Sequence, residues 1–325
     1  MRRRTLAAAL GGALALPAAG RAQPGERVRR VGILAAIAAD GHPGLAALRE
    51  GLQVLGWIEG RNILFDLRST DADPGRADAL AMELVGRRPD VLVGHTLAAT
   101  VALKKQTGTL PIVGIALADP VGSGLVDSLA RPDGNVTGFV NFEPSIGGKW
   151  LELLGEVVPG LRRVGFMFNP ATSTVAEYLR SVQGASRSLG IEIVVSPVRS
   201  ESEIETIIGA LGGTPGTGLI VPPDVFLSTN DARVVDLAAK HRLPTMYAYR
   251  RWAARGGLMV YGIDTVDLFH RAAPYVDRLL RGAHVAELPV QYPTKFEFAI
   301  NLGTANALGV KISPALLARA DEVIE

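Results

Sequence analysis

The sequence predicts an α/β protein of two lobes, each built on a parallel β-sheet. From residue 27 onward, short β-branched strands alternate with amphipathic helical stretches, the order of elements that is typical of parallel sheets. The same order of elements recurs about 133 residues later in the chain. At 325 residues the chain is long enough for two such units.

The first half carries its strand and helix signals in alternating order. The predicted strands are residues 31–35, 62–68, 91–94 and 112–117. Leucines at spacings of three and four predict a helix over residues 45–55. Asp73 and Pro74 have the residue types of an N-cap and a first helical position, so a second helix is expected from there to Leu84.

Four short matches indicate that the second half repeats the topology of the first. The sequence Arg-Arg-Val-Gly, then the pairs Leu-Gly, Arg-Ser and Leu-Pro, occur twice in the same order. The matches begin at residues 29 and 162, 55 and 189, 68 and 199, and 110 and 243. Two Rossmann-like lobes are therefore expected. Because ligands of parallel sheets bind beyond the carboxyl ends of the strands, two facing lobes predict a cleft that closes about a hinge.

Residues 1–22 are predicted to be a secretory signal peptide. Three arginines at positions 2–4 precede an apolar run at 5–20, and small residues occupy positions 20 and 22. The run of about 16 residues is shorter than the roughly 20 that span a bilayer. We expect cleavage after Ala22, a mature chain that begins at Gln23, and a periplasmic location. Export by the Sec or by the Tat route stays open.

Charge and composition exclude several classes of protein. The chain has 34 basic and 32 acidic residues, and without the four arginines of the signal 30 basic residues remain. This balance does not indicate a nucleic-acid or anionic-membrane surface. The absence of cysteine excludes disulfides, thiolate catalysis and a lipid anchor at the cleavage site. Neither the five histidines nor the glycines at 213, 216 and 218 form a metal or dinucleotide motif, so we expect no metal and no cofactor.

Several segments together resemble one protein family over residues 28–325. They are Asp119–Val126, Ser128–Pro132, Gly134–Gly138, Gly256–Met259, Tyr261–Gly262, Pro293–Glu297 and Leu316–Glu325. The chain is similar to the ABC transporter substrate-binding family that includes the tryptophan-import-type binding proteins. The resemblance implies a type I periplasmic-binding fold, a small-molecule solute and a membrane permease as partner. Two residues depart from the family pattern: His95, where a smaller residue is expected near the pocket, and Asp133, where glycine is usual.

The resemblance also implies that the chain crosses between the lobes several times. The first lobe is expected to hold residues 27–142 with about 265–292. The second lobe is expected to hold residues 143–264 with about 293–325. The helix within Thr265–Arg281 would then return to the first lobe.

Candidate ligand-binding residues of the first lobe follow its predicted strands. Thr96, Leu97 and Ala98 open a helix, where a hydroxyl and free N–H groups suit a carboxylate. A plain N-cap explains the threonine equally well. Asp119 follows the strand at 112–117, where it either caps a helix near Val121 or lines the cleft.

The second lobe offers acidic and polar residues at equivalent places. Asn169 and Thr172 lie in the loop after the strand at 164–168, where a ligand contact and an ordinary helix start are both open. Asp224 follows the strand at 219–221, where its carboxylate either receives a ligand ammonium or caps a helix. Asp264 is an alternative partner for a cation.

Aromatic residues gather near two strand ends of the second lobe. Tyr247 and Tyr249 are expected to end the strand after Pro244, and Trp252 follows them. Tyr261 is expected to end the strand at 258–260. Such rings either stack on a flat ligand or belong to the core.

These residues predict a monomeric solute-binding protein without catalytic activity. An anionic group would bind near Thr96 and a cationic group near Asp224, so the expected solute is an amino acid or a related carboxylate with an apolar or aromatic body. Thr96→Ala and Asp224→Ala are each expected to weaken binding with little loss of fold. A secreted hydrolase that uses Asp119 and Asp224 is the alternative, although no nucleophile and base pair accompanies them. A regulator's sensor domain is excluded by the signal peptide and by the lack of a helix-turn-helix.

Overall fold

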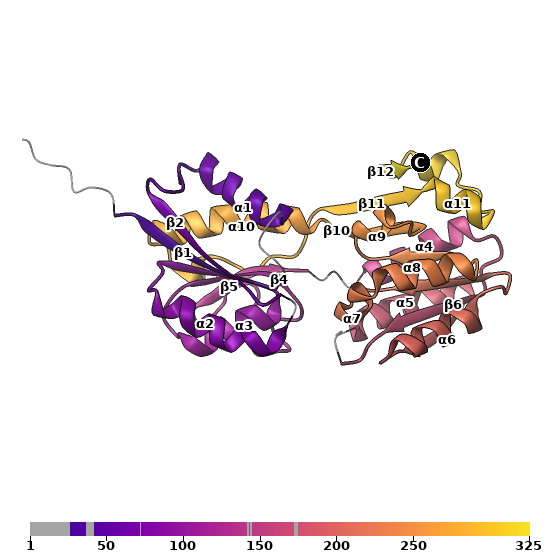
Figure 1. Cartoon of the computed structure of the whole chain (residues 1–325), viewed down its shortest axis with the longest axis horizontal. Helices are drawn as coiled ribbons and strands as arrows, with labels where there is room; N and C mark the ends of the chain where they lie inside the picture. The colour runs from indigo at the N-terminus through magenta and orange to yellow at the C-terminus, as the bar shows by residue number, and fades with distance from the viewer. Residues whose placement is uncertain (1–26, 37–41, 72, 142, 144, 172–174) are drawn as a thin grey trace, which may run out of the picture.

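The computed structural model consists of two α/β lobes that lie side by side (Figure 1). It describes residues 27–325 except 37–41, 72, 142, 144 and 172–174. Each lobe has one sheet with helices on both faces. The chain passes between the lobes after the fifth strand, after the tenth strand and before the eleventh strand.

The first sheet has five parallel strands in the order β2-β1-β3-β4-β5. Its strands are β1 Arg29–Ala35, β2 Ile63–Ser69, β3 Val91–His95, β4 Ile112–Leu117 and β5 Val136–Val140. The central strands are apolar runs buried on both faces, as strands covered by helices on each side must be. The helices of this lobe are α1 Pro43–Val54, η1 Pro74–Arg76, α2 Ala77–Gly86, α3 Leu97–Gln106, α10 Thr265–Leu280 and η2 Val285–Glu287.

The second sheet has seven strands in the order β12-β11-β10-β9-β8-β6-β7. They are β6 Arg163–Phe168, β7 Glu192–Pro197, β8 Thr217–Val221, β9 Thr245–Tyr247, β10 Met259–Ile263, β11 Phe296–Asn301 and β12 Glu322–Ile324. Only β11 runs antiparallel to its neighbour β10. The helices are α4 Ile146–Val157, α5 Ala176–Leu189, α6 Glu201–Leu211, α7 Val225–Thr229, α8 Asp231–Lys240, α9 Arg251–Ala254, α11 Leu302–Leu308 and α12 Pro314–Leu317.

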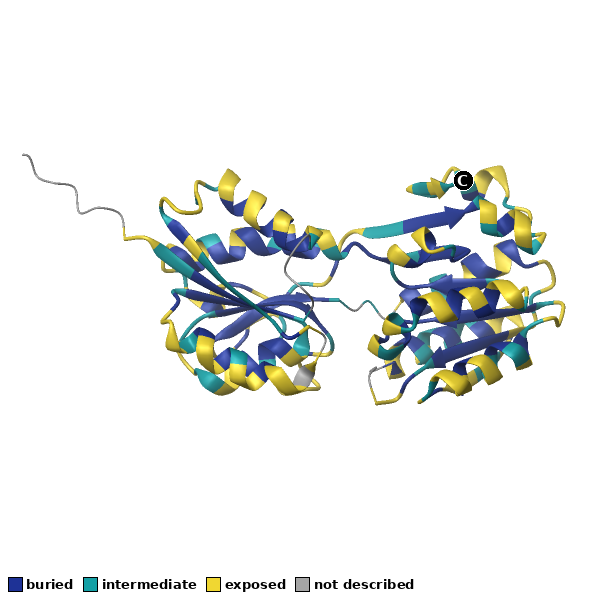
Figure 2. Cartoon of the chain, viewed as in Figure 1, coloured by how far each residue is buried: buried dark blue, intermediate teal, exposed yellow. Residues whose placement is uncertain are grey.

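Buried side chains form one apolar layer on each face of each sheet. In the first lobe one layer lies under α1 and α10, and the other lies under α2 and α3. The second lobe has two equivalent layers, one of them under α4 and α5. Figure 2 shows buried strands between helices whose outer faces are exposed. Each lobe therefore has its own core, and every extensively packed pair of elements lies within one lobe.

The two sheets repeat one topology, as the sequence matches predicted. The order β2-β1-β3-β4-β5 corresponds to β7-β6-β8-β9-β10. The helix that follows each fifth strand is exchanged between the lobes. Helix α4 follows β5 but packs on α5 in the second lobe, and α10 follows β10 but packs on α1 in the first.

Three local expectations were wrong. The segment after Asp119 forms a turn and not a helix near Val121. Strand β9 stops at Tyr247, so Tyr249 lies beyond it. Strand β10 continues to Ile263, which places Tyr261 inside the strand and not at its end. The extension follows from pairing with the antiparallel β11, which the sequence did not reveal.

Two other features bear on location and on helix starts. Among the described residues, none of the helices combines the length and apolar character needed to cross a membrane. The helix expected from Asp73 begins as a single 3-10 turn before α2.

Candidate functional site

The cleft-facing edge of the first lobe is formed where β3 meets α3. Gly94 allows the helix to approach, since a Cβ there would lie 2.5 Å from the Thr100 Oγ1 atom. Thr96 is the N-cap residue of α3, but its side chain makes no capping hydrogen bond. Leu97 is half-buried and Ala98 is exposed, so the first turn of α3 presents its backbone N–H groups at the surface. This helix start can accept an anion.

Thr96 itself has an unusual backbone. Its φ of 87° lies in the left-handed range, which a β-branched residue seldom adopts. Strain of this kind costs about 1–3 kcal/mol and is common at functional sites. Replacing Thr96 with glycine is therefore expected to raise the free energy of unfolding by about 1 kcal/mol, measured by urea denaturation.

Thr96→Ala is the matched control for that variant. Since the hydroxyl caps nothing, removing it is expected to change stability by less than about 0.5 kcal/mol. A loss of 1 kcal/mol or more in Thr96→Ala would contradict this assignment.

Asp119 is exposed, and its carboxylate stabilises the turn in which it lies. Its Oδ1 accepts a hydrogen bond of 2.8 Å from the backbone N–H of Gly122. A Cβ at Gly122 would lie 2.1 Å from the Asp119 Oδ2, so the turn requires glycine there. The structure does not bring Asp119 together with Asp224, the other carboxylate of the hydrolase alternative, because they belong to different lobes.

Asp224 and Asn169 lie together at the facing edge of the second lobe. The backbone N–H of Asn169 donates to Asp224 Oδ2 at 2.7 Å, and that of Leu227 donates to Oδ1 at 2.8 Å. Asp224 is 5% exposed. Its carboxylate therefore joins the loop after β6 to the start of α7. Thr172, expected beside Asn169, lies outside the described residues.

Tyr249 and Tyr178 continue this edge toward the first crossing between the lobes. Burial raises the pKa of Tyr249 to about 12, and the Asp224 carboxylate adds to that effect. Tyr178, on α5, is 4% exposed and its hydroxyl lies 3.4 Å from the Asn141 carbonyl oxygen. Burial and the neighbouring Tyr249 raise its pKa well above the usual range. Sequence reasoning did not single out Tyr178.

Tyr247 occupies a different environment from Tyr249. It is 1% exposed, and its ring stacks on Trp252 with centroids 4.7 Å apart. Both rings belong to the core between the second sheet and its outer helices. Of the aromatics expected near this strand end, only Tyr249 lies near Asp224.

Asp264 connects the crossing after β10 with the crossing before β11. Its Oδ1 accepts from the backbone N–H of Asp267 and so caps α10, and its Oδ2 lies 2.7 Å from the Lys295 Nζ. The backbone N–H of Asp264 also donates to the Lys295 carbonyl. Burial tends to raise the pKa of Asp264, but the Lys295 ammonium and the capping bond outweigh it and lower that pKa. Asp264 is therefore an element of the hinge.

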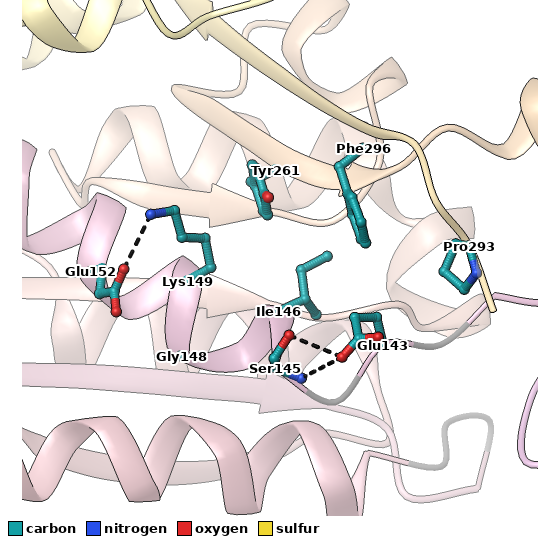
Figure 3. Close-up of a pocket in the computed structure, with 9 residues that line it drawn as sticks. All are labelled: Glu143, Ser145, Ile146, Gly148, Lys149, Glu152, Tyr261, Pro293 and Phe296. Atoms are coloured by element: carbon teal, nitrogen blue, oxygen red, sulfur yellow. Dashed lines mark hydrogen bonds and ion pairs between the residues drawn. The ribbon is translucent and has the colours of Figure 1, made fainter.

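A groove of about 500 Å³ lies beside the hinge (Figure 3). The rings of Tyr261 and Phe296 stack in parallel with centroids 6.0 Å apart and form its apolar wall. Charged groups lie opposite, where Lys149 pairs with Glu152 at 3.2 Å. The other lining residues are Glu143, Ser145, Ile146, Gly148 and Pro293. Tyr261 is the one sequence-predicted site residue in this groove.

Six of the predicted residues lie at two edges, one on each lobe. Thr96, Leu97 and Ala98 form the first edge, and Asn169, Asp224 and Tyr249 lie on the second. Strands β3, β6 and β8 point their carboxyl ends at the space between the lobes (Figure 1). An anion-accepting helix start on one side thus lies opposite a buried carboxylate on the other.

Comparison with known protein families shows the family of the chain. The family model of the ABC transporter substrate binding protein matches residues 30–324. The chain belongs to this family.

Individual proteins also resemble the chain over most of its length. A tyrosine-binding protein of Clostridioides difficile is 27% identical, covering 83% of this chain and 79% of that protein. The crystal structure of a conserved domain protein from Vibrio cholerae is 28% identical, with a TM-score of 0.80 over 91% of this chain and 100% of the other. A Streptococcus pneumonia domain in complex with L-Trp is 24% identical, with a TM-score of 0.80 over 91% and 99% of the two chains. The fold is that of type I periplasmic binding proteins.

The residue types that bind metal ions are dispersed in the part of this substrate-binding protein that the structure describes. Among the residues that the structure describes, no three His, Cys, Asp or Glu side chains lie close enough together to hold one. The polar groups of both edges instead suit a small organic molecule with charged ends.

Proposed function

We propose that this substrate-binding protein captures an amino acid or a related carboxylate, with an apolar or aromatic body, between its two lobes. The observation that carries the proposal is the pairing of opposite edges: the open start of α3 with Thr96 on one side, and Asp224 with Asn169 on the other. A carboxylate suits the first edge and an ammonium the second. Tyr249 adds apolar surface beside Asp224. The tyrosine-binding relative supports the same class of solute.

Closure about the crossings would bring the two edges onto the solute. We propose that the lobes move as units of residues 27–142 with 265–292, and 143–264 with 293–325. Among the described helices and strands, no extensively packed pair joins the two lobes, and this supports such movement. The ion pair between Asp264 and Lys295 would hold the segment after β10 next to the segment before β11 while the lobes turn.

Delivery to a membrane permease, an extracytoplasmic location and a monomeric state complete the proposal. Residues 1–22, which lie outside the described part of the chain, would act as the export signal. N-terminal sequencing of the exported chain tests this, with Gln23 as the expected first residue. No catalytic step is proposed, and recovery of an added solute unchanged after long incubation is the corresponding test.

The solute class can be tested by calorimetry on protein that has been unfolded, stripped of ligand and refolded. L-Tyrosine and L-tryptophan are the first probes. A specific solute at 100 times its Kd is expected to add about 2.7 kcal/mol to the free energy of unfolding. Tight binding of a neutral sugar, with none of any amino acid or carboxylate, would overturn the proposal.

A further inference from the structure

Two histidines and a phenylalanine cluster at the edge of the first lobe that faces the cleft. His95 is the last residue of β3, His42 is the N-cap of α1, and Phe269 lies near the start of α10. The ring centroids of His42 and His95 are 5.5 Å apart, and both rings lie within 5.2 Å of the Phe269 ring. We call His42 and His95 the histidine pair.

The proton of His42 can be placed from its hydrogen bond. The backbone N–H of Leu45 donates to His42 Nδ1 at 3.2 Å, so this nitrogen must carry a lone pair. A neutral ring then carries its proton on Nε2. The cap of α1 therefore fixes His42 as a donor through Nε2.

The proton of His95 can be placed from burial. Its Nδ1 is the one buried side-chain polar atom among the described residues that has no hydrogen-bond partner. An unpaired buried N–H is rarer than an unpaired acceptor, so the lone pair belongs on Nδ1 and the proton on Nε2. The Nε2 atoms of both histidines have no hydrogen bond in the described part of the chain, and neither is among its buried unpaired atoms. Both therefore reach solvent.

Burial favours the neutral form of both histidines. Burial lowers the pKa of His95 to about 4, with the neighbouring His42 adding to the effect. Burial also lowers the pKa of His42, although the proximity of its own backbone carbonyl opposes this. At neutral pH the pair thus presents two neutral N–H donors and no acceptor toward solvent.

A metal ion is a poor fit to the same geometry. It would need the lone pairs of both Nε2 atoms. The proton of His42 would then move to Nδ1, where it would clash with the N–H of Leu45. The proton of His95 would also move to Nδ1, where it would be buried without an acceptor. An anion with two oxygens suits this pair better, because rings whose centroids are 5.5 Å apart are close enough for one carboxylate to accept from a donor on each.

We propose that His42 and His95 determine solute specificity by donating hydrogen bonds from their Nε2 atoms to the carboxylate of the bound solute. This inference rests on the proposed function and names the groups of the first lobe that select an anionic solute. The start of α3, next to His95, would add backbone donors to the same group.

Two variants remove one donor each while keeping the local structure. His95→Phe keeps the ring contacts with Phe269, and His42→Asn keeps an oxygen that caps α1. Each is expected to weaken L-tyrosine or L-tryptophan binding about 10-fold or more, the effect of one hydrogen bond to a charged group. His95→Gln, which retains a donor at a similar distance, is expected to bind nearly as tightly as the wild type. His284→Gln, an exposed histidine outside the cluster, is the matched control.

The outcomes separate this inference from the proposed function. If the wild type binds either amino acid, and both His95→Phe and His42→Asn bind it equally tightly, the proposed role of the histidine pair is overturned. The proposed function would remain intact. If neither amino acid binds, 3-(4-hydroxyphenyl)propionate tests the pair without an ammonium. Failure of that carboxylate to bind the wild type would overturn both proposals.

Two further measurements do not depend on affinity. Nitrogen-15 spectra of the imidazole rings are expected to show the proton on Nε2 in both histidines, and a proton on Nδ1 of His95 would overturn the assignment. An anion bound to the pair raises the pKa of both rings, so solute binding at pH 5.5 is expected to take up protons. Calorimetry in two buffers of different ionisation enthalpy measures this uptake, which a purely structural histidine would not produce.

Discussion

Asp224→Ala is expected to lower the free energy of unfolding by about 3 kcal/mol and to abolish solute binding. The carboxylate accepts from the backbone N–H groups of Asn169 and Leu227, and alanine would leave both without that acceptor. An unsatisfied buried donor costs about 1–3 kcal/mol, and a lost helix cap about 1 kcal/mol. Urea denaturation measures the first effect and calorimetry the second.

Asp224→Asn is the control for this variant. Its side-chain oxygen can still accept from one of the two N–H groups, so about half of the stability loss is expected while the negative charge is absent. The sequence alone led us to expect that Asp224→Ala would leave the fold nearly unchanged, and the two hydrogen bonds replace that expectation. Equal stability of Asp224→Ala and the wild type would show that water replaces the carboxylate at both donors.

The second large effect is a loss of stability on acidification that depends on His95. Burial lowers the pKa of His95 to about 4 from 6.5, so below pH 6.5 the unfolded chain binds more protons than the folded one. Stability therefore falls as the pH falls. Between pH 7 and pH 4 this group alone is expected to remove about 3 kcal/mol.

The comparison of His95→Phe with the wild type isolates that contribution. Carboxylates such as Asp264, whose pKa is lowered, also lose stability in acid, but they do so in both proteins. The difference in unfolding free energy between variant and wild type is thus expected to grow in favour of the variant as the pH falls from 7 to 4.5. Parallel pH profiles would mean that the pKa of His95 is not lowered in the folded protein.

Local signals in the sequence predicted the repeated α/β units. Apolar runs such as 91–94 are stable only in a sheet that is covered on both faces. The sequence matches about 133 residues apart indicated a second lobe with the same order of strands. The antiparallel strand β11 could not be predicted, because its direction depends on the position of a chain returning from the other lobe.

The candidate site was predictable where it follows from strand ends. Thr96 and Asn169 come directly after parallel strands, and Asp224 follows one by three residues, and this places all three at the lobe edges. Tyr178 could not be found in this way, because it lies on a helix face at the spacing of ordinary core residues. The histidine pair depends on contacts between residues 42, 95 and 269, which no local pattern reveals.

The exchange of α10 makes the first lobe depend on a distant part of the chain for its folding. The apolar face of α1, with Leu45, Leu48 and Leu52, is covered by a helix more than 200 residues away. Contacts of such long sequence separation form slowly, since loop closure precedes any gain in burial. During synthesis the first core stays incomplete until residue 280 is available. A chain cut at the first crossing would yield one fragment with an uncovered α1 and another with an uncovered α10, and the first lobe would be completed only when the two fragments assemble.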